Sequence, residues 1–273
     1  MPFIMLASEY LTQLIWVKSK EGQDFVMRLS TSFIAASLLA ASTLCMARSA
    51  VPYEIVTEEW APYNYTSEGQ LKGLSTDIVM AIMALTGDRF PIHVLPSLRA
   101  GAVLSRHPRT IMYSLFRTEE RNSSYKWVGP IIEESVFPYK RRGASLVIKS
   151  VDDLKRLKRI TCRHAGVIPA KLQSMGFENL DMAATESIQL YRMLLAGHAD
   201  VIVGDTELGV RYYLGVLGVK QSQLEKIPIE VFRSSLYIAF SADSDDTTIK
   251  AWQKALLQLK ASGQLAQIQA RYQ

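Results

Sequence analysis

Cysteine and histidine are scarce in this chain, which contains 2 cysteines and 4 histidines among 273 residues. A single cysteine, Cys162, remains outside the N-terminal segment, so no internal disulfide is expected in the mature protein. Cys162 and His164 are the one pair of cysteine or histidine residues that is close in sequence, and two ligands are too few for a protein-held metal. The sequence also lacks HExxH, GxSxG and phosphate-binding glycine motifs. We therefore predict neither a metal nor a cofactor.

Neither sign of charge dominates the chain, whose formal net charge is +5. The densest basic clusters, Lys140 to Arg142 and Lys155 to Arg159, lack interleaved aromatic residues and are interpreted as solvated faces. No nucleic-acid partner is expected. A hydrophobic content of 48% with 21% charged residues is typical of a globular protein, and the length suffices for two domains.

Long hydrophobic runs are absent except near the N-terminus. The apolar stretch from Phe33 to Leu44 is too short for a membrane-spanning helix. It follows Arg28 and precedes the small residues Ala47 to Ala50, which is the order of a secretory signal. We expect residues 27–49 to be a signal peptide, cleaved after Ser49, that directs the protein to the periplasm.

Residues 1–26 do not fit this arrangement, because a signal normally begins close to its basic residue. Met27 directly precedes Arg28. We expect residues 1–26 to be an upstream extension or the result of a misassigned start.

The remaining chain alternates between short apolar strands and amphipathic helices, which predicts an α/β protein with two such sets. The expected strands are 53–57, 90–95, 110–114, 159–162, 200–203 and 236–240, with another near Asp181. The expected helices are 76–85, 97–106, 151–157, 169–175, 188–196, 206–217, 248–261 and 264–272. An irregular aromatic stretch and two extended segments, 137–139 and 145–148, are expected between the sets. Ligands of such folds bind where the carboxyl ends of the strands face a crevice.

The segment YSLFRTEERN, Tyr113 to Asn122, indicates an anion-binding site. An apolar run ends in Ser114 and then in a turn that presents Arg121, whose planar guanidinium can hold a carboxylate with two hydrogen bonds. The alternative is a solvated turn in which Arg121 pairs with Glu119 or Glu120.

Four segments in order resemble the bacterial extracellular solute-binding proteins of family 3, which are periplasmic receptors for polar amino acids. They are EEWAPYNY with GQLKGLSTDIVMAI, SLFRTEER with WVGPI, LLAGHADVIVGD, and ALLQLKASGQLAQIQARY. The resemblance covers nearly all of residues 51–273 and implies a type II periplasmic binding protein fold, with each lobe a mostly parallel sheet flanked by helices. It implies lobe 1 at 50–139 and 234–273 and lobe 2 at 140–233, with crossovers near 139–145 and 228–234.

The resemblance also implies roles for individual residues. Arg121 falls at the position that binds the ligand α-carboxylate, and Asp205 at the position that binds the α-ammonium. Trp60 corresponds to an aromatic residue that covers the ligand, and Ser114 to a serine that donates a hydrogen bond. The alternatives are helix capping for Asp205, core packing for Trp60, and a locally satisfied hydroxyl for Ser114.

Two departures from the family pattern lie at expected ligand-binding positions. Phe116 stands where many amino-acid receptors have a second serine, and Ala165, Gly166 and Val167 stand where they have Gly-Ser-Thr. Two carboxylate-binding hydroxyls are therefore missing, which indicates a divergent branch. Phe116 could stack on a ligand or serve only in packing.

Three functions are compatible with these observations. The favoured one is a monomeric periplasmic receptor for an amino acid or related polar solute, which serves an ABC permease or a sensor. The second is an enzyme of the same fold, such as a cyclic-carboxylate dehydratase, with Glu58, Glu59 or His164 as possible catalytic groups by position. The third is a module that regulates a membrane partner without transport.

Overall fold

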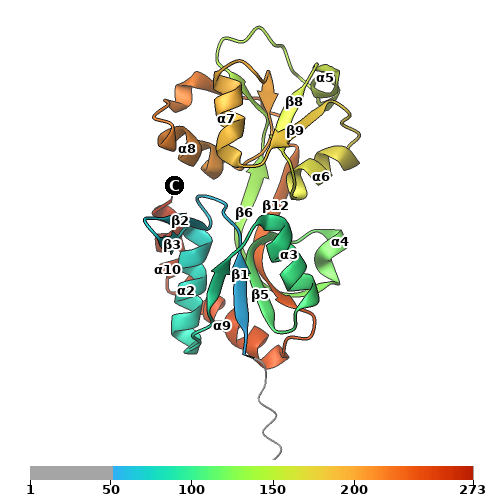
Figure 1. Cartoon of the computed structure of the whole chain (residues 1–273). Coiled ribbons are helices and arrows are strands. Elements are labelled where there is room, and N and C mark those ends of the chain that lie inside the picture. The colour runs from blue at the N-terminus through green and yellow to red at the C-terminus, as the bar shows by residue number, and fades with distance from the viewer. Residues whose placement is uncertain (1–51, 273) are drawn as a thin grey trace, which may run out of the picture. The chain divides into compact units, whose positions relative to one another are not determined.

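The computed structural model describes residues 52–272, which form two five-stranded β-sheets with helices on their faces and a separate two-stranded sheet (Figure 1). The expected extension at 1–26 and the expected signal peptide at 27–49 lie outside the described residues. We call the first sheet with its helices lobe 1 and the second sheet with its helices lobe 2. Within 52–272, no helix is long and apolar enough to cross a membrane.

Lobe 1 contains a five-stranded sheet with the order β4-β1-β5-β12-β6. Its strands are β1 (Glu54–Thr57), β4 (Ile92–Val94), β5 (Thr110–Phe116), β6 (Tyr125–Val136) and β12 (Phe232–Ser241). Strands β4, β1 and β5 pair in parallel, and β12 is antiparallel to both β5 and β6. Four strands therefore run in one direction and only β12 runs against them. A small hairpin, β2 (Tyr65–Ser67) and β3 (Gln70–Lys72), lies beside the sheet.

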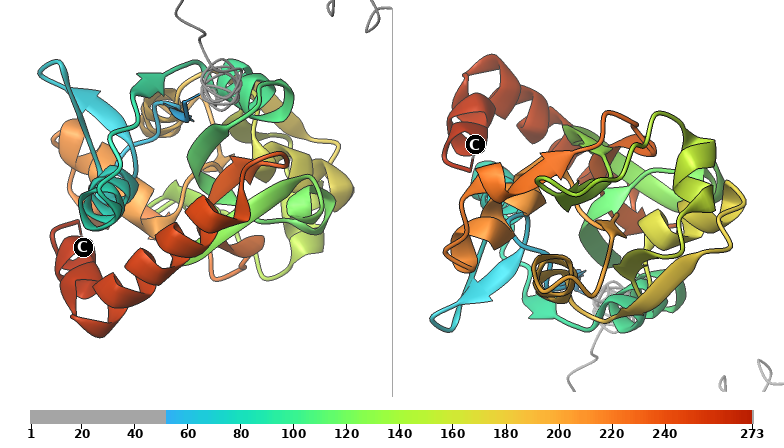
Figure 2. Two further views of the ribbon diagram at one scale, coloured as in Figure 1. Left: turned by 90° about the horizontal axis from the view of Figure 1, so that it is seen from below. Right: turned by 90° about the horizontal axis from the view of Figure 1, so that it is seen from above.

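The helices of lobe 1 are α2 (Leu74–Thr86), α3 (Ser97–Arg106), α4 (Glu119–Asn122), α9 (Asp246–Ala261) and α10 (Gln264–Ala270). Alternate side chains of β1 point to opposite faces, as in any strand. Ile55 packs in the core with Ile78 of α2 and Trp252 of α9, whereas Val56 packs with Leu104 of α3. Figure 2 shows α9 and α3 on opposite sides of the sheet.

Lobe 2 contains a second five-stranded sheet, with the order β11-β7-β10-β8-β9. Its strands are β7 (Tyr139–Arg141), β8 (Ile160–Arg163), β9 (Leu180–Ala184), β10 (Val201–Ile202) and β11 (Leu224–Lys226). Strands β10, β8 and β9 pair in parallel, and β7 is antiparallel to both β10 and β11. This sheet again has a single reversed strand, so the expected mostly parallel sheets are confirmed in both lobes.

The helices of lobe 2 are α5 (Val151–Arg156), α6 (Val167–Ser174), α7 (Ser187–Leu195) and α8 (Glu207–Val216), with a 3-10 turn at Gln221–Gln223. Val201 of β10 packs in a core cluster with Leu172 of α6, and its neighbour Ile202 packs with Leu190 of α7 and Leu214 of α8. The alternation of the strand thus buries both faces of the sheet.

The chain passes between the two sheets twice. β6 ends at Val136 and β7 begins at Tyr139, and later β11 ends at Lys226 and β12 begins at Phe232. The connections are therefore residues 137–138 and 227–231, a few residues before the expected ranges 139–145 and 228–234. The expected first range includes all of β7, whose short polar sequence gives little sign of a strand. Figure 1 shows β6 and β12 running from lobe 1 towards lobe 2.

The largest difference from the sequence prediction is β6, which has 12 residues where an irregular stretch was expected. Gly129 and Pro130 interrupt its apolar pattern, and proline is tolerated in strands mainly at the edge of a sheet. β6 is the edge strand of the first sheet. The expected extended segment 145–148 belongs to no strand of the part of the chain that the structure describes.

Candidate ligand-binding site

A cavity of about 130 Å³ lies between the lobes and is lined by both of them. A buried water needs about 10–15 Å³ of cavity volume, so this one can hold a small organic molecule. Five of the six residues expected at the ligand line it: Trp60, Ser114, Phe116, Arg121 and Val167. Asp205 is not part of the lining.

Ser114 faces the cavity because of a β-bulge in β5. Between the pairs Tyr237–Leu115 and Ala239–Met112, β5 contains one more residue than β12. Ser114 has a φ of 63°, in the left-handed region that non-glycine residues seldom adopt. Such bulges re-aim side chains next to functional sites. The Ser114 side chain is 5% exposed and, among residues 52–272, its Oγ has no hydrogen-bond partner, so it is not locally satisfied.

Arg121 lies in the one-turn helix α4, directly after the strand that carries Ser114. It lines the cavity, and no ion pair within 52–272 joins it to Glu119 or Glu120. The nearby Arg117 is held differently: its Nε donates to Asn122, and its guanidinium lies over the rings of Trp127 and Tyr237. The solvated-turn alternative, in which Arg121 is paired with its acidic neighbours, is thus not what the structure contains.

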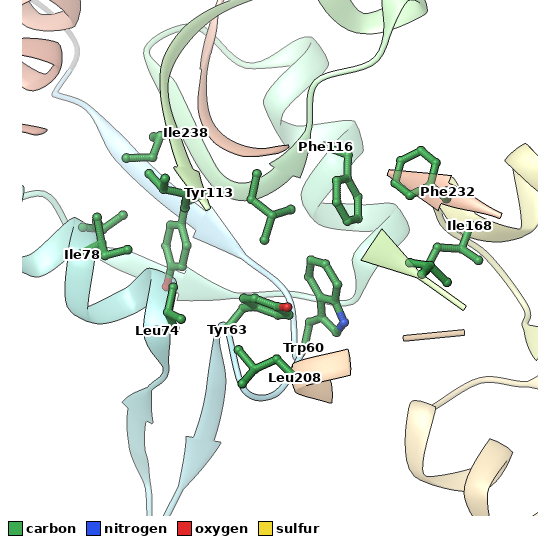
Figure 3. Packing of buried hydrophobic residues seen from close by; sticks show 14 of the residues in the cluster. Trp60, Tyr63, Leu74, Ile78, Tyr113, Phe116, Ile168, Leu208, Phe232 and Ile238 are labelled. Atoms are coloured by element: carbon green, nitrogen blue, oxygen red, sulfur yellow. The ribbon is translucent and has the colours of Figure 1, made fainter. Parts of the chain in front are cut away.

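Trp60 and Phe116 form one aromatic wall of the cavity (Figure 3). Their ring centroids are 5.7 Å apart, Trp60 also contacts Tyr63 at 4.5 Å, and Phe116 packs edge-on against Phe232 at 4.8 Å. Both side chains are at least nine-tenths buried. The same two residues therefore pack in the core and line the cavity.

Asp205 is buried behind this wall and accepts three hydrogen bonds from protein side chains. Oδ1 accepts from Trp60 Nε1 at 3.3 Å and from Ser187 Oγ at 3.1 Å, and Oδ2 accepts from Tyr191 OH at 3.0 Å. Burial raises the pKa of Asp205, while the charge of Arg163 and these hydrogen bonds act in the opposite direction. Asp205 thus joins Trp60 of lobe 1 to α7 of lobe 2.

The residue after Asp205 caps the helix that begins here. Thr206 is the N-cap of α8, and its Oγ1 accepts from Gly209 N at 3.2 Å. Its hydroxyl also lies 2.6 Å from Tyr63 OH of lobe 1. The alternative reading of Asp205 as the cap is therefore wrong, because the helix begins one residue later than that reading requires.

The wall from lobe 2 includes the N-terminus of α6. Ala165, Gly166, Val167, Ile168 and Pro169 all line the cavity. Gly166 is the N-cap with a φ of 119°, and no side chain caps this end of the helix. The first N–H groups of a helix have no partner within it and carry a partial positive charge.

Arg163 is the functional candidate that sequence reasoning missed. It is the last residue of β8 and lines the cavity from lobe 2. Its Nη2 lies 3.8 Å from Glu58 Oε2 of lobe 1, and its buried Nε has no hydrogen-bond partner within 52–272. The signal was available, because Arg163 directly follows the strand expected at 159–162, and ligand-binding residues gather at such strand ends.

The possible catalytic groups are dispersed. Glu58 lines the cavity, whereas Glu59 is exposed and accepts hydrogen bonds from Thr66, and His164 is exposed outside the lining. Cys162 is buried, which raises the pKa of its thiol to about 11. Within 52–272, no three His, Cys, Asp or Glu side chains are grouped to hold a metal.

The arrangement of two lobes around a cavity is that of the periplasmic binding proteins, and solved structures have the same fold. A histidine kinase sensor domain described as similar to periplasmic binding proteins has a TM-score of 0.71 at 16% identity, covering 81% of this chain and 95% of that one. The GluR0 ligand-binding core from Nostoc punctiforme with L-glutamate has a TM-score of 0.69 at 19% identity, covering 81% and 99%. The arginine-, lysine-, histidine-binding protein ArtJ from Geobacillus stearothermophilus has 0.67 at 20% identity, covering 81% and 94%.

Residues 54–273 match the family of bacterial extracellular solute-binding proteins, family 3, and the chain belongs to this family. No curated protein matches the sequence. The family resemblance and the two-lobed fold expected from the sequence are thus confirmed, and the low identities agree with a divergent branch.

Proposed function

We propose that this protein is a periplasmic receptor that binds an amino acid or a related small polar solute between its lobes and presents it to an ABC-type permease. The observation that carries the proposal is the shared cavity: Arg121 enters it from lobe 1, and Arg163 with the N-terminus of α6 enters it from lobe 2. A ligand that touches both walls has a higher affinity for the closed form, and it therefore shifts the equilibrium between open and closed lobes.

Direct contacts between the lobes support such a closed form. They include the hydrogen bonds from Trp60 to Asp205 and between Tyr63 and Thr206, and the ion pair of Glu58 with Arg163. The lobe 1 partners lie shortly after β1, and the lobe 2 partners lie at the end of β8 or shortly after β10. The two connections at 137–138 and 227–231 would serve as the hinge.

A membrane-bound sensor is the second candidate for the partner. It is favoured by the likeness to a histidine kinase sensor domain, just as the permease is favoured by the likeness to an amino acid ABC transporter substrate-binding protein. The ligand and the closure would be the same in both cases, because the choice concerns which membrane protein reads the closed lobes. We expect the receptor to be a monomer.

Binding without catalysis is the favoured reading of the cavity. Of the three possible catalytic groups, Glu58 alone lines it, and its carboxylate faces the guanidinium of Arg163. A general acid or base would need a proton-transfer partner on the ligand rather than an ion-pair partner in the protein. We expect no turnover of a cyclic carboxylate such as prephenate.

The test is a ligand screen by thermal shift on the purified full-length chain, with each hit confirmed by calorimetry. Amino acids, polyamines and carboxylates should be included. Arg121→Ala should cost about 2–5 kcal/mol of binding because it leaves a desolvated ligand charge unmatched, and Arg121→Lys should also weaken binding because an ammonium lacks the planar fork. The matched control is Arg106→Ala, on the exposed end of α3.

Small-angle scattering on the same samples tests closure. The radius of gyration should fall when a ligand confirmed by calorimetry is bound. Binding without compaction would remove the support for a closing receptor, and turnover of the ligand would favour the enzyme.

A further inference from the structure

Among the charged side chains that line the cavity between the lobes, two are arginines and one is a carboxylate. Guanidinium groups supply donors from both walls, Arg121 from lobe 1 and Arg163 from lobe 2. The N-terminus of α6 adds backbone N–H groups, and Ser114 adds a hydroxyl that is 95% buried and has no partner within 52–272. Among the cavity-lining residues of this part of the chain, Glu58 is the one carboxylate. The complementary ligand is therefore rich in acceptor oxygens.

The group that would hold an ammonium is already engaged. Asp205 is 2% exposed, and its two oxygens accept from Trp60, Ser187 and Tyr191. It lies outside the lining of the cavity. A ligand ammonium that took the place of the Trp60 indole on Asp205 would leave a buried N–H without an acceptor.

Glu58 is less suited to that role than a free carboxylate, because its negative charge is already compensated by Arg163 across the lobes, with Nη2 3.8 Å from Oε2. This separation is too long for a hydrogen bond, so the guanidinium keeps donors for another acceptor. The unpaired Nε of Arg163 is one of them.

From this arrangement we propose that the ligand is a small dicarboxylate, with one carboxylate held by Arg121 and Ser114 and the other by Arg163 and the N-terminus of α6. The proposal rests on the proposed function, since it names the class of solute for the same cavity. Trp60 and Phe116 also line the cavity, and such apolar rings suit a short apolar spacer rather than an inorganic anion.

Two matched pairs of ligands separate a dicarboxylate from an amino acid. Glutarate should bind the full-length chain at least about tenfold more tightly than L-glutamate, and succinate more tightly than L-aspartate, because the amino acids bring an ammonium that finds no free carboxylate. Inorganic phosphate serves as the anion without a spacer and should bind more weakly than glutarate. Calorimetry gives all the affinities.

Variants of Arg163 test the second carboxylate position. Arg163→Gln should weaken glutarate by about tenfold or more and should change the affinity of pentanoate, which has one carboxylate, by less than about twofold. Arg192→Gln, at an exposed arginine of lobe 2, is the control and should change neither. This comparison distinguishes a ligand contact from a general loss of lobe closure, since lost closure would weaken both ligands alike.

The outcomes separate the two proposals. If L-glutamate or another amino acid binds more tightly than its partner without the ammonium, the dicarboxylate proposal is wrong and the proposed receptor function stands. A phosphate affinity above that of glutarate also overturns it. If no compound of the screen binds, both proposals fail.

Discussion

Asp205 should stabilise the protein even when no ligand is present. Its carboxylate accepts from Trp60, Ser187 and Tyr191, which are 6%, 4% and 1% exposed. In Asp205→Ala each of these donors loses its acceptor, and a buried donor without a partner costs about 1–3 kcal/mol. Trp60 and Ser187 line cavities where water can replace part of the lost bond, whereas the enclosed Tyr191 cannot be reached so easily. Removing the desolvated charge offsets part of the loss. We expect a net decrease of about 2–4 kcal/mol in the free energy of unfolding.

Asp205→Asn is the matched control. The amide oxygen can still accept from Trp60 and Ser187, and the Tyr191 hydroxyl can accept from the amide nitrogen, so the decrease should be about 1 kcal/mol or less. The assay is urea unfolding without ligand, followed by circular dichroism and by tryptophan fluorescence, with stability from linear extrapolation. In a chain of this size, each 1 kcal/mol corresponds to about 2–4 °C in the unfolding midpoint.

A free energy of unfolding for Asp205→Ala within about 0.5 kcal/mol of the wild type, together with a loss of ligand binding, would refute this structural role of Asp205. That result would assign Asp205 to the ligand, as the family pattern implies. A double-mutant cycle with Tyr191→Phe adds a second check. The hydroxyl needs no acceptor once it is removed, so Asp205→Ala should cost less in that background, with a coupling of about 0.5–3 kcal/mol.

Three further changes test other parts of the molecule. Burial raises the pKa of Glu134 to about 7 from 4.5. The stability that its neutral carboxyl contributes is therefore fully present below the pKa of the unfolded state and is lost as the pH rises through the pKa of the folded state. Glu134→Gln should remove about 2–3 kcal/mol of this pH dependence in urea unfolding. Ser114→Gly should relieve the backbone strain of a φ of 63° and raise the free energy of unfolding by up to about 1 kcal/mol, while ligand affinity falls in calorimetry. A lower free energy of unfolding would show that Ser114 is not strained. Gly73→Ala should cost about 3 kcal/mol or more, because its Cβ would overlap the Tyr63 carbonyl oxygen. Gly87→Ala, with open space around it, should cost about 1–2 kcal/mol, and equal losses in thermal unfolding would contradict the overlap.

Local pattern was sufficient for the elements whose apolar residues follow one clear period. The helix expected at 97–106 has these bounds in the structure, and the helix expected at 76–85 runs over Leu74–Thr86 and ends at Gly87 in a left-handed conformation. Glycine adopts this conformation without steric cost, so the sequence alone predicts where the helix ends.

Pattern was insufficient where a strand depends on its partners. β6 contains Gly129 and Pro130 in its middle and pairs only with β12, which comes about one hundred residues later. The alternation of buried and exposed side chains in β6 can be recognised only once its position at the edge of the sheet is known. The bulge that re-aims Ser114 is likewise a property of the pairing between β5 and β12, which the sequence of β5 alone does not specify.

The candidate site likewise depends partly on local sequence and partly on contacts between distant segments. The motif around Arg121 could be found from the sequence, because the strand, the turn and the guanidinium are close in sequence, and Arg121 lines the cavity. The surroundings of Asp205 could not be read in this way, since its donors come from residues 18 and 14 positions earlier and, for Trp60, from the other lobe. Family position alone therefore placed Asp205 in contact with a ligand, while the structure gives its oxygens to the protein.

The departures from the family pattern become consistent once Arg163 is included. Phe116 and Val167 remove two hydroxyl donors from the expected carboxylate site, and this loss alone would weaken the binding of an anion. Arg163 lines the opposite wall, as does the N-terminus of α6, and within residues 52–272 its Nε has no hydrogen-bond partner and that helix end has no side-chain cap. Charged donors form stronger hydrogen bonds to a carboxylate than neutral hydroxyls do. With the proposed dicarboxylate, the donors for anions would come from both lobes, and the closure of the lobes and the recognition of two negative groups would then be parts of the same event.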